Sequence, residues 1–278
     1  MTHPATATGA ARPSGLLRAL PVAALALSPL PALAQDQSPY GDLAQQLADP
    51  VANLISVPFQ NNFDFGGGRD GNAFRYTLNF QPVIPFTLSP DWNLITRTII
   101  PISHAERVFA DHRTGLGDVL QSFFVSPARP TAGGLVWGAG PAFLYPTATE
   151  GLGAGQWAAG LTGVVLQISG RWQYGVLANH LWGLGDGGPE RPRVNNSFVQ
   201  PFVVYTFPTH TSVSLNTEAS YNWDRRQLTM PVNLTVSQLA LIGGQPVQFG
   251  VGARVFVEGP RGAPDWGVRF NMTLVFPR

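Results

Sequence analysis

The chain has 278 residues, of which 44% are hydrophobic and only 12% are charged, and its net charge is +1. It contains no Cys and no Lys, so all 17 basic residues are Arg, while Gly (31) and Pro (25) are abundant. These figures exclude a disordered chain, a disulfide or cysteine-ligated zinc scaffold, and a nucleic-acid binder, which usually carries a strong basic excess. The Gly and Pro content disfavours a helical bundle. We therefore expect an all-β protein whose outer face does not meet water.

Residues 1–34 are typical of a secretory signal peptide. Arg12 and Arg18 precede an apolar run at residues 19–33, and Ala32-Leu33-Ala34 has the small-x-small pattern of a cleavage site. A transmembrane anchor is the alternative, but the run is short and interrupted by prolines, whereas a spanning helix needs about 20 apolar residues. We therefore expect export through a cleaved N-terminal signal peptide.

The mature chain divides into two parts. Leu43 and Leu47 lie four residues apart within residues 40–48, which predicts a short amphipathic helix or plug. We assign residues 35–52 to an N-terminal periplasmic segment that contains this helix. Residues 53–278 are assigned to a transmembrane β-barrel.

From Ile55 onward the chain alternates with a period of two, which is typical of strands. The clearest segment, residues 73–86, has aromatic and apolar residues at even positions and mostly polar residues at odd positions. Segments 212–223 and 266–276 follow the same rule. The alternation predicts about twelve strands, at residues 55–65, 73–86, 92–103, 118–126, 135–146, 157–168, 172–183, 197–207, 212–223, 228–238, 247–257 and 266–276.

A soluble exported β-sandwich is the alternative, because its strands alternate in the same way. Several predicted strands, however, have about ten or more residues, near the membrane-spanning length, whereas sandwich strands average about five or six. Aromatic residues also cluster near the strand ends, as in the girdles of outer-membrane barrels. We expect a closed antiparallel up-and-down β-barrel, because an open sheet edge in hydrocarbon leaves backbone groups unpaired.

The connections alternate in character. On one side they are short, at residues 89–91, 169–171, 208–210 and 243–245, with one longer Pro-rich connection at 126–133. On the other side they are longer and charged, at residues 104–115, 147–156, 185–196 and 258–265. Short turns on one side and long loops on the other are typical of an outer-membrane barrel.

Several stretches also resemble a known group of bacterial exported proteins. They include DPVANLISVPFQNN at residues 49–62, QPVIPF at 81–86, DWNLITRTIIP at 91–101, GLGD at 115–118, GAGP at 138–141, PTAT at 146–149, QPF at 200–202 and PDWGVRF at 264–270. The group is the bacterial outer-membrane β-barrel transporter family, labelled phenol-degradation MetA-pathway-like and often mislabelled neuromedin U. The resemblance implies a transmembrane β-barrel in the outer membrane of a Gram-negative bacterium and says little about the substrate.

Candidate metal and catalytic residues give weak signals. His104 and His112 share a predicted loop with Glu106 and Asp111, a set that suits several cations, although loop polarity explains it equally well. A barrel hydrolase needs Ser, His and an orienting group together, and the adjacent pairs Ser103-His104 and Asn179-His180 point to opposite faces of a strand. We therefore expect no enzyme, no catalytic residue, no metal site and no cofactor.

The polar faces carry the functional prediction. If the apolar faces contact lipid, the residues that project inward and contact solute are Asp64, Arg75, Arg97, Asn216, Glu218, Asn233, Arg254, Arg269 and Asn271. Arginines outnumber carboxylates in this set, and guanidinium groups hydrogen-bond anions. Opposed charges that pair and fill the interior are the structural alternative.

We expect an outer-membrane channel or transporter for the passive passage of small solutes, with anionic or aromatic solutes as the candidates and the loops at 104–115 and 185–196 restricting access. Its expected partners are outer-membrane lipid, the small solute and the barrel-insertion machinery, with no nucleic acid. A structural or ligand-binding barrel with a sealed lumen is the main alternative.

Overall fold

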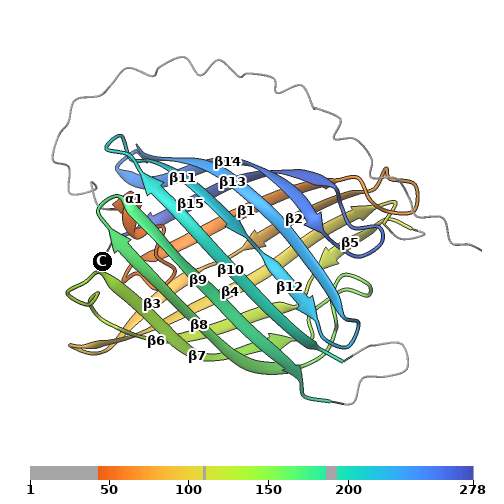
Figure 1. Cartoon of the computed structure of the whole chain (residues 1–278), viewed down its shortest axis with the longest axis horizontal. Coiled ribbons are helices and arrows are strands. Elements are labelled where there is room, and N and C mark those ends of the chain that lie inside the picture. The colour runs from red at the N-terminus through yellow and green to blue at the C-terminus, as the bar shows by residue number, and fades with distance from the viewer. Residues whose placement is uncertain (1–42, 109–110, 186–192, 278) are drawn as a thin grey trace, which may run out of the picture. The chain divides into compact units, whose positions relative to one another are not determined.

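The computed structural model describes residues 43–108, 111–185 and 193–277, which form a β-barrel (Figure 1). The signal peptide expected at residues 1–34 lies outside the described residues, as does the start of the segment at 35–52. Within the described ranges, no helix has the length and apolar character that a membrane crossing requires.

One short helix precedes the strands. Helix α1 spans Leu43–Gln46. The strands are β1 (Ile55–Phe65), β2 (Phe74–Phe80), β3 (Val83–Ser89), β4 (Trp92–Glu106), β5 (Arg113–Leu116), β6 (Val119–Pro127), β7 (Leu135–Tyr145), β8 (Ala158–Ser169), β9 (Trp172–Gly183), β10 (Asn195–Thr206), β11 (Thr211–Thr217), β12 (Ala219–Asn222), β13 (Gln227–Ile242), β14 (Gln245–Glu258) and β15 (Trp266–Phe276).

All strand pairs are antiparallel, and the sheet closes through β1 and β15, which pair from Ile55 with Phe276 to Phe65 with Trp266. Three pairs of short strands, β2 with β3, β5 with β6 and β11 with β12, each share one position in the wall, so the 15 strands fill twelve positions. The closed barrel is confirmed, and the β-sandwich alternative is wrong, because no edge remains between the first and last strands.

Proline causes two of the three interruptions, because it has no N–H to donate to the ladder. Pro82 separates β2 from β3, and its carbonyl still accepts a hydrogen bond from the Thr98 N–H at 3.1 Å. Pro231, on β13, faces the gap between β11 and β12. The Thr217 hydroxyl donates to the Pro231 carbonyl at 2.8 Å, and the Glu218 N–H donates to it at 3.3 Å.

The two ends of the barrel differ. The first residue of β1, Ile55, and the last residue of β15, Phe276, pair at the end of the barrel that carries the short turns. We call this end the turn end and the opposite end the loop end. The loop predicted at 104–115 is shorter than expected, because β4 continues to Glu106 and β5 begins at Arg113. Part of the loop predicted at 185–196 lies outside the described residues.

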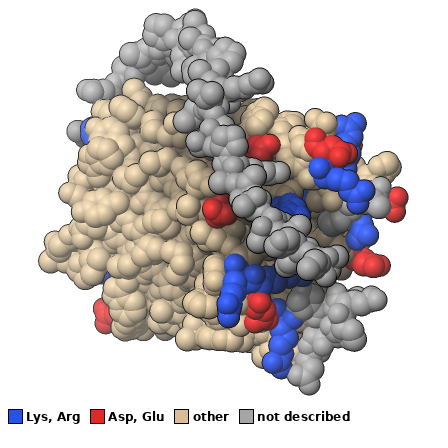
Figure 2. Space-filling model, turned by 45° about the vertical axis from the view of Figure 1, so that its right-hand side comes forward, with Lys and Arg blue, Asp and Glu red and all other residues tan. Residues whose placement is uncertain are grey.

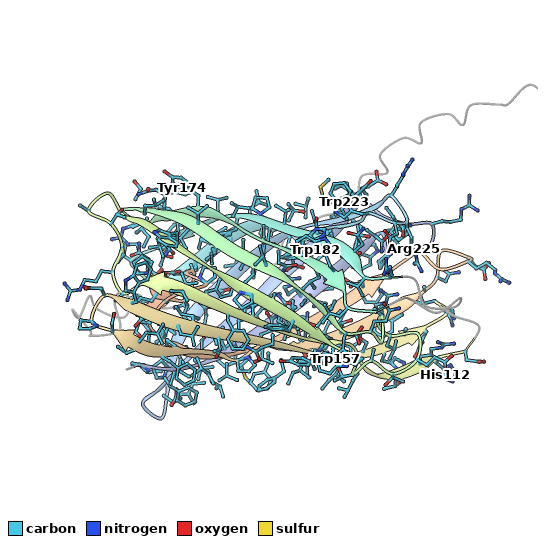
Figure 3. The ribbon with its side chains drawn as sticks, turned by 90° about the horizontal axis from the view of Figure 1, so that it is seen from below. His112, Trp157, Tyr174, Trp182, Trp223 and Arg225 are labelled. Atoms are coloured by element: carbon cyan, nitrogen blue, oxygen red, sulfur yellow. The ribbon has the colours of Figure 1, made fainter. Side chains whose placement is uncertain are left out.

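The outer wall is apolar and carries aromatic side chains near both ends. Exposed rings include Trp92, Trp172, Tyr174 and Phe276 near the turn end, and Trp157, Trp182, Trp223 and Trp266 near the loop end. Figure 3 shows Trp157, Trp182 and Trp223 toward the end that also carries His112 and Arg225, with Tyr174 toward the other end. In Figure 2 the charged residues of the visible face gather toward the loop end, and most of the remaining face is uncharged.

Helix α1 and the segment that follows it pack inside the barrel at the turn end. Leu43 and Ala44 of α1 are buried against Leu239 of β13 and Val275 of β15. Further along, Val51 packs against a buried apolar cluster on the neighbouring inner wall, formed by Ile95, Phe124, Val136, Val164, Leu166 and Leu177. This packing explains why the strands between residues 92 and 183 alternate less clearly in sequence: part of their inner face meets apolar protein rather than water.

Candidate functional site: the polar lumen

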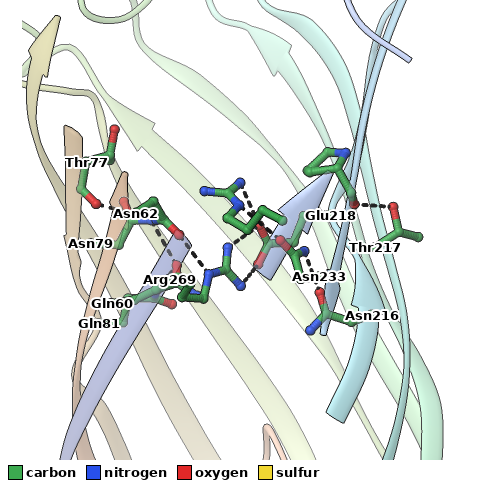
Figure 4. A network of polar contacts seen from close by, with 12 residues as sticks. Gln60, Asn62, Thr77, Asn79, Gln81, Asn216, Thr217, Glu218, Asn233 and Arg269 are labelled. Atoms are coloured by element: carbon green, nitrogen blue, oxygen red, sulfur yellow. Dashed lines mark hydrogen bonds and ion pairs between the residues drawn. The ribbon is translucent and has the colours of Figure 1, made fainter. Parts of the chain in front are cut away.

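The inner wall near the loop end carries a network of charged and amide side chains (Figure 4). Arg269 on β15 donates from Nη1 and Nη2 to the two carboxylate oxygens of Glu218, both at 2.8 Å. Its Nε donates to Asn62 Oδ1 on β1 at 2.7 Å. Arg269 therefore joins β1 to the gap between β11 and β12, and its guanidinium fork matches the carboxylate in a bidentate pair.

A second arginine extends the network. Arg254 Nη1 on β14 lies 3.2 Å from Asp64 Oδ1 on β1. Its Nε donates to Asn233 Oδ1 at 3.0 Å, and its Nη2 lies 3.7 Å from Glu218 Oε2. Asn233 in turn donates to Asn216 Oδ1 at 2.9 Å. Two carboxylates and two guanidinium groups thus hold four elements of the wall together across the lumen.

The interruption of β11 and β12 positions Glu218. Asn216 pairs with Asn233 in the ladder, and pairing resumes where Ser220 faces Thr229. Glu218 lies between these two registers, opposite the proline that cannot donate. Its side chain reaches both arginines from this break in the ladder.

The remaining candidates lie apart from the network. Arg75 on β2 faces Asp64 across the β1–β2 ladder and lines a cavity at the loop end. Arg97 on β4 donates from Nη2 to Gln81 Oε1 at 2.7 Å. Asn271 on β15 lines a different cavity at the turn end. The structure therefore joins Asp64, Asn216, Glu218, Asn233, Arg254 and Arg269, and leaves Arg75, Arg97 and Asn271 outside.

Several polar partners on the same face were not predicted from the sequence. Asn62 is two residues from Asp64 on β1, so the two side chains lie on the same face of the strand and Asn62 could have been predicted to face inward. Gln81 shares parity with Arg75 and receives the Arg97 hydrogen bond. Gln60 joins the same wall, because its Oε1 accepts from Asn79 and Gln81, both at 3.1 Å.

Three cavities follow one another along the lumen. The loop-end cavity has a volume of about 740 Å³ and reaches Phe198, Ser220 and Thr229. These residues also line a middle cavity of about 340 Å³, which extends to Arg97 and Leu177. Arg97 and Leu177 in turn line the turn-end cavity of about 270 Å³. The shared lining residues show that the cavities adjoin one another between the two ends.

The segment after α1 lines the turn-end cavity from within the barrel. Its Asp49 accepts a hydrogen bond from the Val51 N–H at 2.9 Å. Burial raises the pKa of the Asp49 carboxyl from 3.8 to about 6, against the lowering effect of that hydrogen bond. Among the described residues that line this cavity, the other charged group is Arg97.

The histidines do not form the loop cluster considered from sequence. His104 lies within β4 rather than in a loop; its Nδ1 is hydrogen-bonded to Thr114 Oγ1 at 2.5 Å and its Nε2 to Glu106 Oε1 at 3.0 Å. No group of three or more His, Asp or Glu side chains is placed to hold a metal within residues 43–108, 111–185 and 193–277.

A serine–histidine contact that the sequence did not predict occurs on the outer wall. His180 on β9 and Ser197 on β10 face each other in register, with Nδ1 and Oγ 2.7 Å apart. The Trp223 indole N–H donates to the same Oγ at 2.9 Å. A hydrolytic triad also needs a group that orients the imidazole, and within the described part of the chain His180 Nε2 is buried without a hydrogen-bond partner.

Comparisons with known proteins identify the fold. No family model matches the sequence, and no curated protein matches it. Among solved structures, an outer membrane channel from Pseudomonas putida F1 is 16% identical with a TM-score of 0.61, over 80% of this chain and 94% of that chain. The outer membrane phospholipase A from Escherichia coli is 11% identical with a TM-score of 0.48, over 80% of this chain and 90% of that chain. The NanC porin is 9% identical with a TM-score of 0.48, over 80% of this chain and 100% of that chain.

The similarity to the Pseudomonas putida channel supports the fold of an outer-membrane β-barrel. The comparisons also correct one expectation. The fold does not support the inference that the chain is not an enzyme, because a phospholipase is among the structures that resemble it. The barrel fold accommodates both kinds of protein, so function has to be argued from the site.

Proposed function

We propose that the protein is an outer-membrane channel through which small solutes diffuse passively, with a preference for anions. The observation that carries this proposal is the succession of three adjoining cavities along the lumen. Selectivity in such pores follows from the charges and hydrogen-bonding groups that line them.

The anion preference follows from the lining charges. The predicted inward set contains the four arginines Arg75, Arg97, Arg254 and Arg269, and the two carboxylates Asp64 and Glu218. The carboxylates are paired with Arg254 and Arg269. Four arginines against two carboxylates leave the set with two positive charges in excess, which can act on a passing solute.

A lumen that is closed at the turn end is the second candidate. It is favoured by the packing of α1 against Leu239 and Val275 inside the barrel. In that case the exposed loops, rather than the lumen, would bind ligands.

We further propose the finer assignments that the sequence suggested. The chain would be a member of the phenol-degradation MetA-pathway-like group, exported by a Gram-negative bacterium after removal of residues 1–34. Outer-membrane lipid would contact its apolar wall, and the barrel-insertion machinery would place it in the membrane.

Conductance in planar bilayers separates the two candidates. The full mature chain should give discrete conductance steps. A variant that lacks residues 43–48, which include α1, should give larger steps, because the cavity lining at the turn end is removed. A chain that is heat-modifiable on gels, and therefore folded, but gives no steps would support the sealed lumen. Equal steps with and without residues 43–48 would show that the segment does not restrict the path.

A further inference from the structure

The loop-end cavity is lined more by cations than by anions. Its volume is about 740 Å³, within the range of small-molecule sites. Arg69, Arg75, Arg254 and Arg261 line it, together with the carboxylates Asp64 and Glu218. The charged residues at this end are visible in Figure 2.

The carboxylates do not satisfy all of these arginines. Asp64 and Glu218 are engaged by Arg254 and Arg269 at distances of 2.8–3.3 Å. Arg75 lies opposite Asp64 in the ladder and interacts with it electrostatically, but among the described residues its guanidinium donates no hydrogen bond to a side chain or carbonyl. A half-buried guanidinium with unused donors favours a bound anion over water alone.

Two loops bring the other arginines to the same cavity. The Gly68 N–H donates to the Gly262 carbonyl at 3.0 Å, which joins the loop after β1 to the loop before β15. The contact is close: a Cβ at Gly67 would lie 2.0 Å from the Ala263 carbonyl oxygen, and Gly67 has a φ of +67°. Glycine is therefore required for this packing, which holds Arg69 and Arg261 at the mouth of the cavity.

Part of the lining is apolar and aromatic. Phe198 and Phe256 contribute rings, and Pro260 and Pro264 contribute the loop side. The Phe256 ring already packs beneath the guanidinium of Arg254, 5.3 Å from its centroid. An aromatic ring beside a guanidinium fork suits a ligand that combines a flat apolar body with one carboxylate.

We propose that the loop-end cavity binds small aromatic monocarboxylates, with the carboxylate on Arg75, aided by Arg69 and Arg261, and the ring against Phe198 and Phe256. A phosphate fits less well, because it offers no apolar ring for Phe198 and Phe256 to contact. The claim that this site takes up solute for passage rests on the proposed channel function. The claim that the cavity binds such a ligand can be tested without any conductance measurement.

Binding of benzoate to the detergent-solubilised full mature chain, measured by isothermal titration calorimetry, tests the site. Benzoate should bind the wild type, and Arg75→Gln should raise the Kd at least about tenfold, equivalent to about 1.4 kcal/mol. Arg75→Lys should recover part of the loss. Arg129→Gln is the matched control, because Arg129 is exposed on a turn at the other end of the barrel and should leave the Kd unchanged.

The ligand series separates charge from shape. Benzyl alcohol and inorganic phosphate should each bind at least about tenfold more weakly than benzoate. If Arg75→Gln does not fold, as judged by heat-modifiable mobility, Arg261→Gln on the exposed loop should still weaken benzoate binding. Absence of benzoate binding to the wild type, equal affinity of folded Arg75→Gln, or equal affinity for benzyl alcohol would each overturn the proposal. Bilayer conductance is recorded in parallel, so a protein that conducts without binding benzoate refutes this site and leaves the channel intact.

Discussion

Glu218 and Arg269 form a bidentate pair across the lumen, with both N–O distances at 2.8 Å, although two complete strands, β13 and β14, separate them in the wall. Their side chains are 19% and 3% exposed. The pair exists because Pro231 interrupts the ladder opposite Glu218, and the adjacent strand places Arg254 within reach of the same carboxylate. A proline on one strand therefore helps to position the charged groups on the inner wall near the loop end.

Glu218→Gln should destabilise the barrel and increase its anion preference. The change leaves Arg269 and Arg254 without a full negative partner, at an expected cost of about 1–3 kcal/mol, less than for a fully dry pair because the lumen admits water. Urea unfolding in lipid vesicles measures the cost. Glu258→Gln, at the exposed end of β14, is the control and should change stability little. A Glu218→Gln barrel as stable as the wild type would show that the pair contributes nothing.

Leu215→Arg tests which solvent meets the outer wall. Leu215 is 46% exposed and pairs with Leu234 near the middle of the wall. An arginine at this mid-wall position should lower the free energy of unfolding by about 2–4 kcal/mol in a bilayer. An arginine on the outer face near the membrane interface should lower it by only about 0–1 kcal/mol. Val257→Arg, on the same outer face near the loop end, provides the interfacial control. Equal, small costs at both positions in the vesicle unfolding assay would contradict a lipid-facing wall.

The alternation of apolar and polar residues predicted the closed barrel, its twelve wall positions and most strand bounds. Strand β1 begins and ends where its segment was predicted, at Ile55 and Phe65, although Asn61 interrupts the apolar parity of its outer face. Strands β6 to β9 alternated less clearly, since Phe124 and Leu166 face an apolar segment from the N-terminus rather than water. Period-two patterns report burial, and they cannot distinguish burial by lipid from burial by the chain itself.

The candidate site was predicted as a face and not as a network. Parity placed Asp64, Glu218, Arg254 and Arg269 on one side of their strands, but pairing across the lumen depends on the closure and stagger of the barrel. The close approach of Glu218 and Arg269 links strands that are not neighbours, and no local pattern contains that information.

Docking of the N-terminal segment should depend on pH through Asp49. The folded pKa of Asp49, about 6, exceeds its ordinary value of 3.8, so the docked state holds the proton more tightly than the released state. Docking should therefore be most favourable below about pH 4, weaken between about pH 4 and 6, and stay constant above about pH 6. The docking free energy should weaken by at most about 3 kcal/mol over this range. Hydrogen–deuterium exchange of residues 43–54 measures this change.

Asp49→Asn should remove the pH dependence and slow exchange in this segment at pH 7. Asp91→Asn, on an exposed turn, is the control and should retain the wild-type profile. Exchange that slows as the pH rises from about 4 to 6, after correction for the intrinsic rate, would contradict the assigned direction.

Asp118→Ala should loosen the loop at residues 147–156. The Asp118 carboxylate accepts hydrogen bonds from the N–H groups of Ala148, Ala154 and Gly155 at 2.5–3.3 Å. Loss of these contacts should lower the local opening free energy by about 1–3 kcal/mol, which limited proteolysis of the loop detects. Asp70→Ala, on another exposed loop, should not increase cleavage there. Unchanged protection in Asp118→Ala would show that other contacts hold the loop.

The reversal potential of the wild-type protein in a planar bilayer under a KCl gradient tests the central claim most directly, because it reports whether ions cross the polar lumen and which sign of charge is preferred. We expect discrete conductance with chloride preferred over potassium, and a larger preference in Glu218→Gln. A folded, heat-modifiable barrel that conducts no ions, or that prefers potassium, would contradict it.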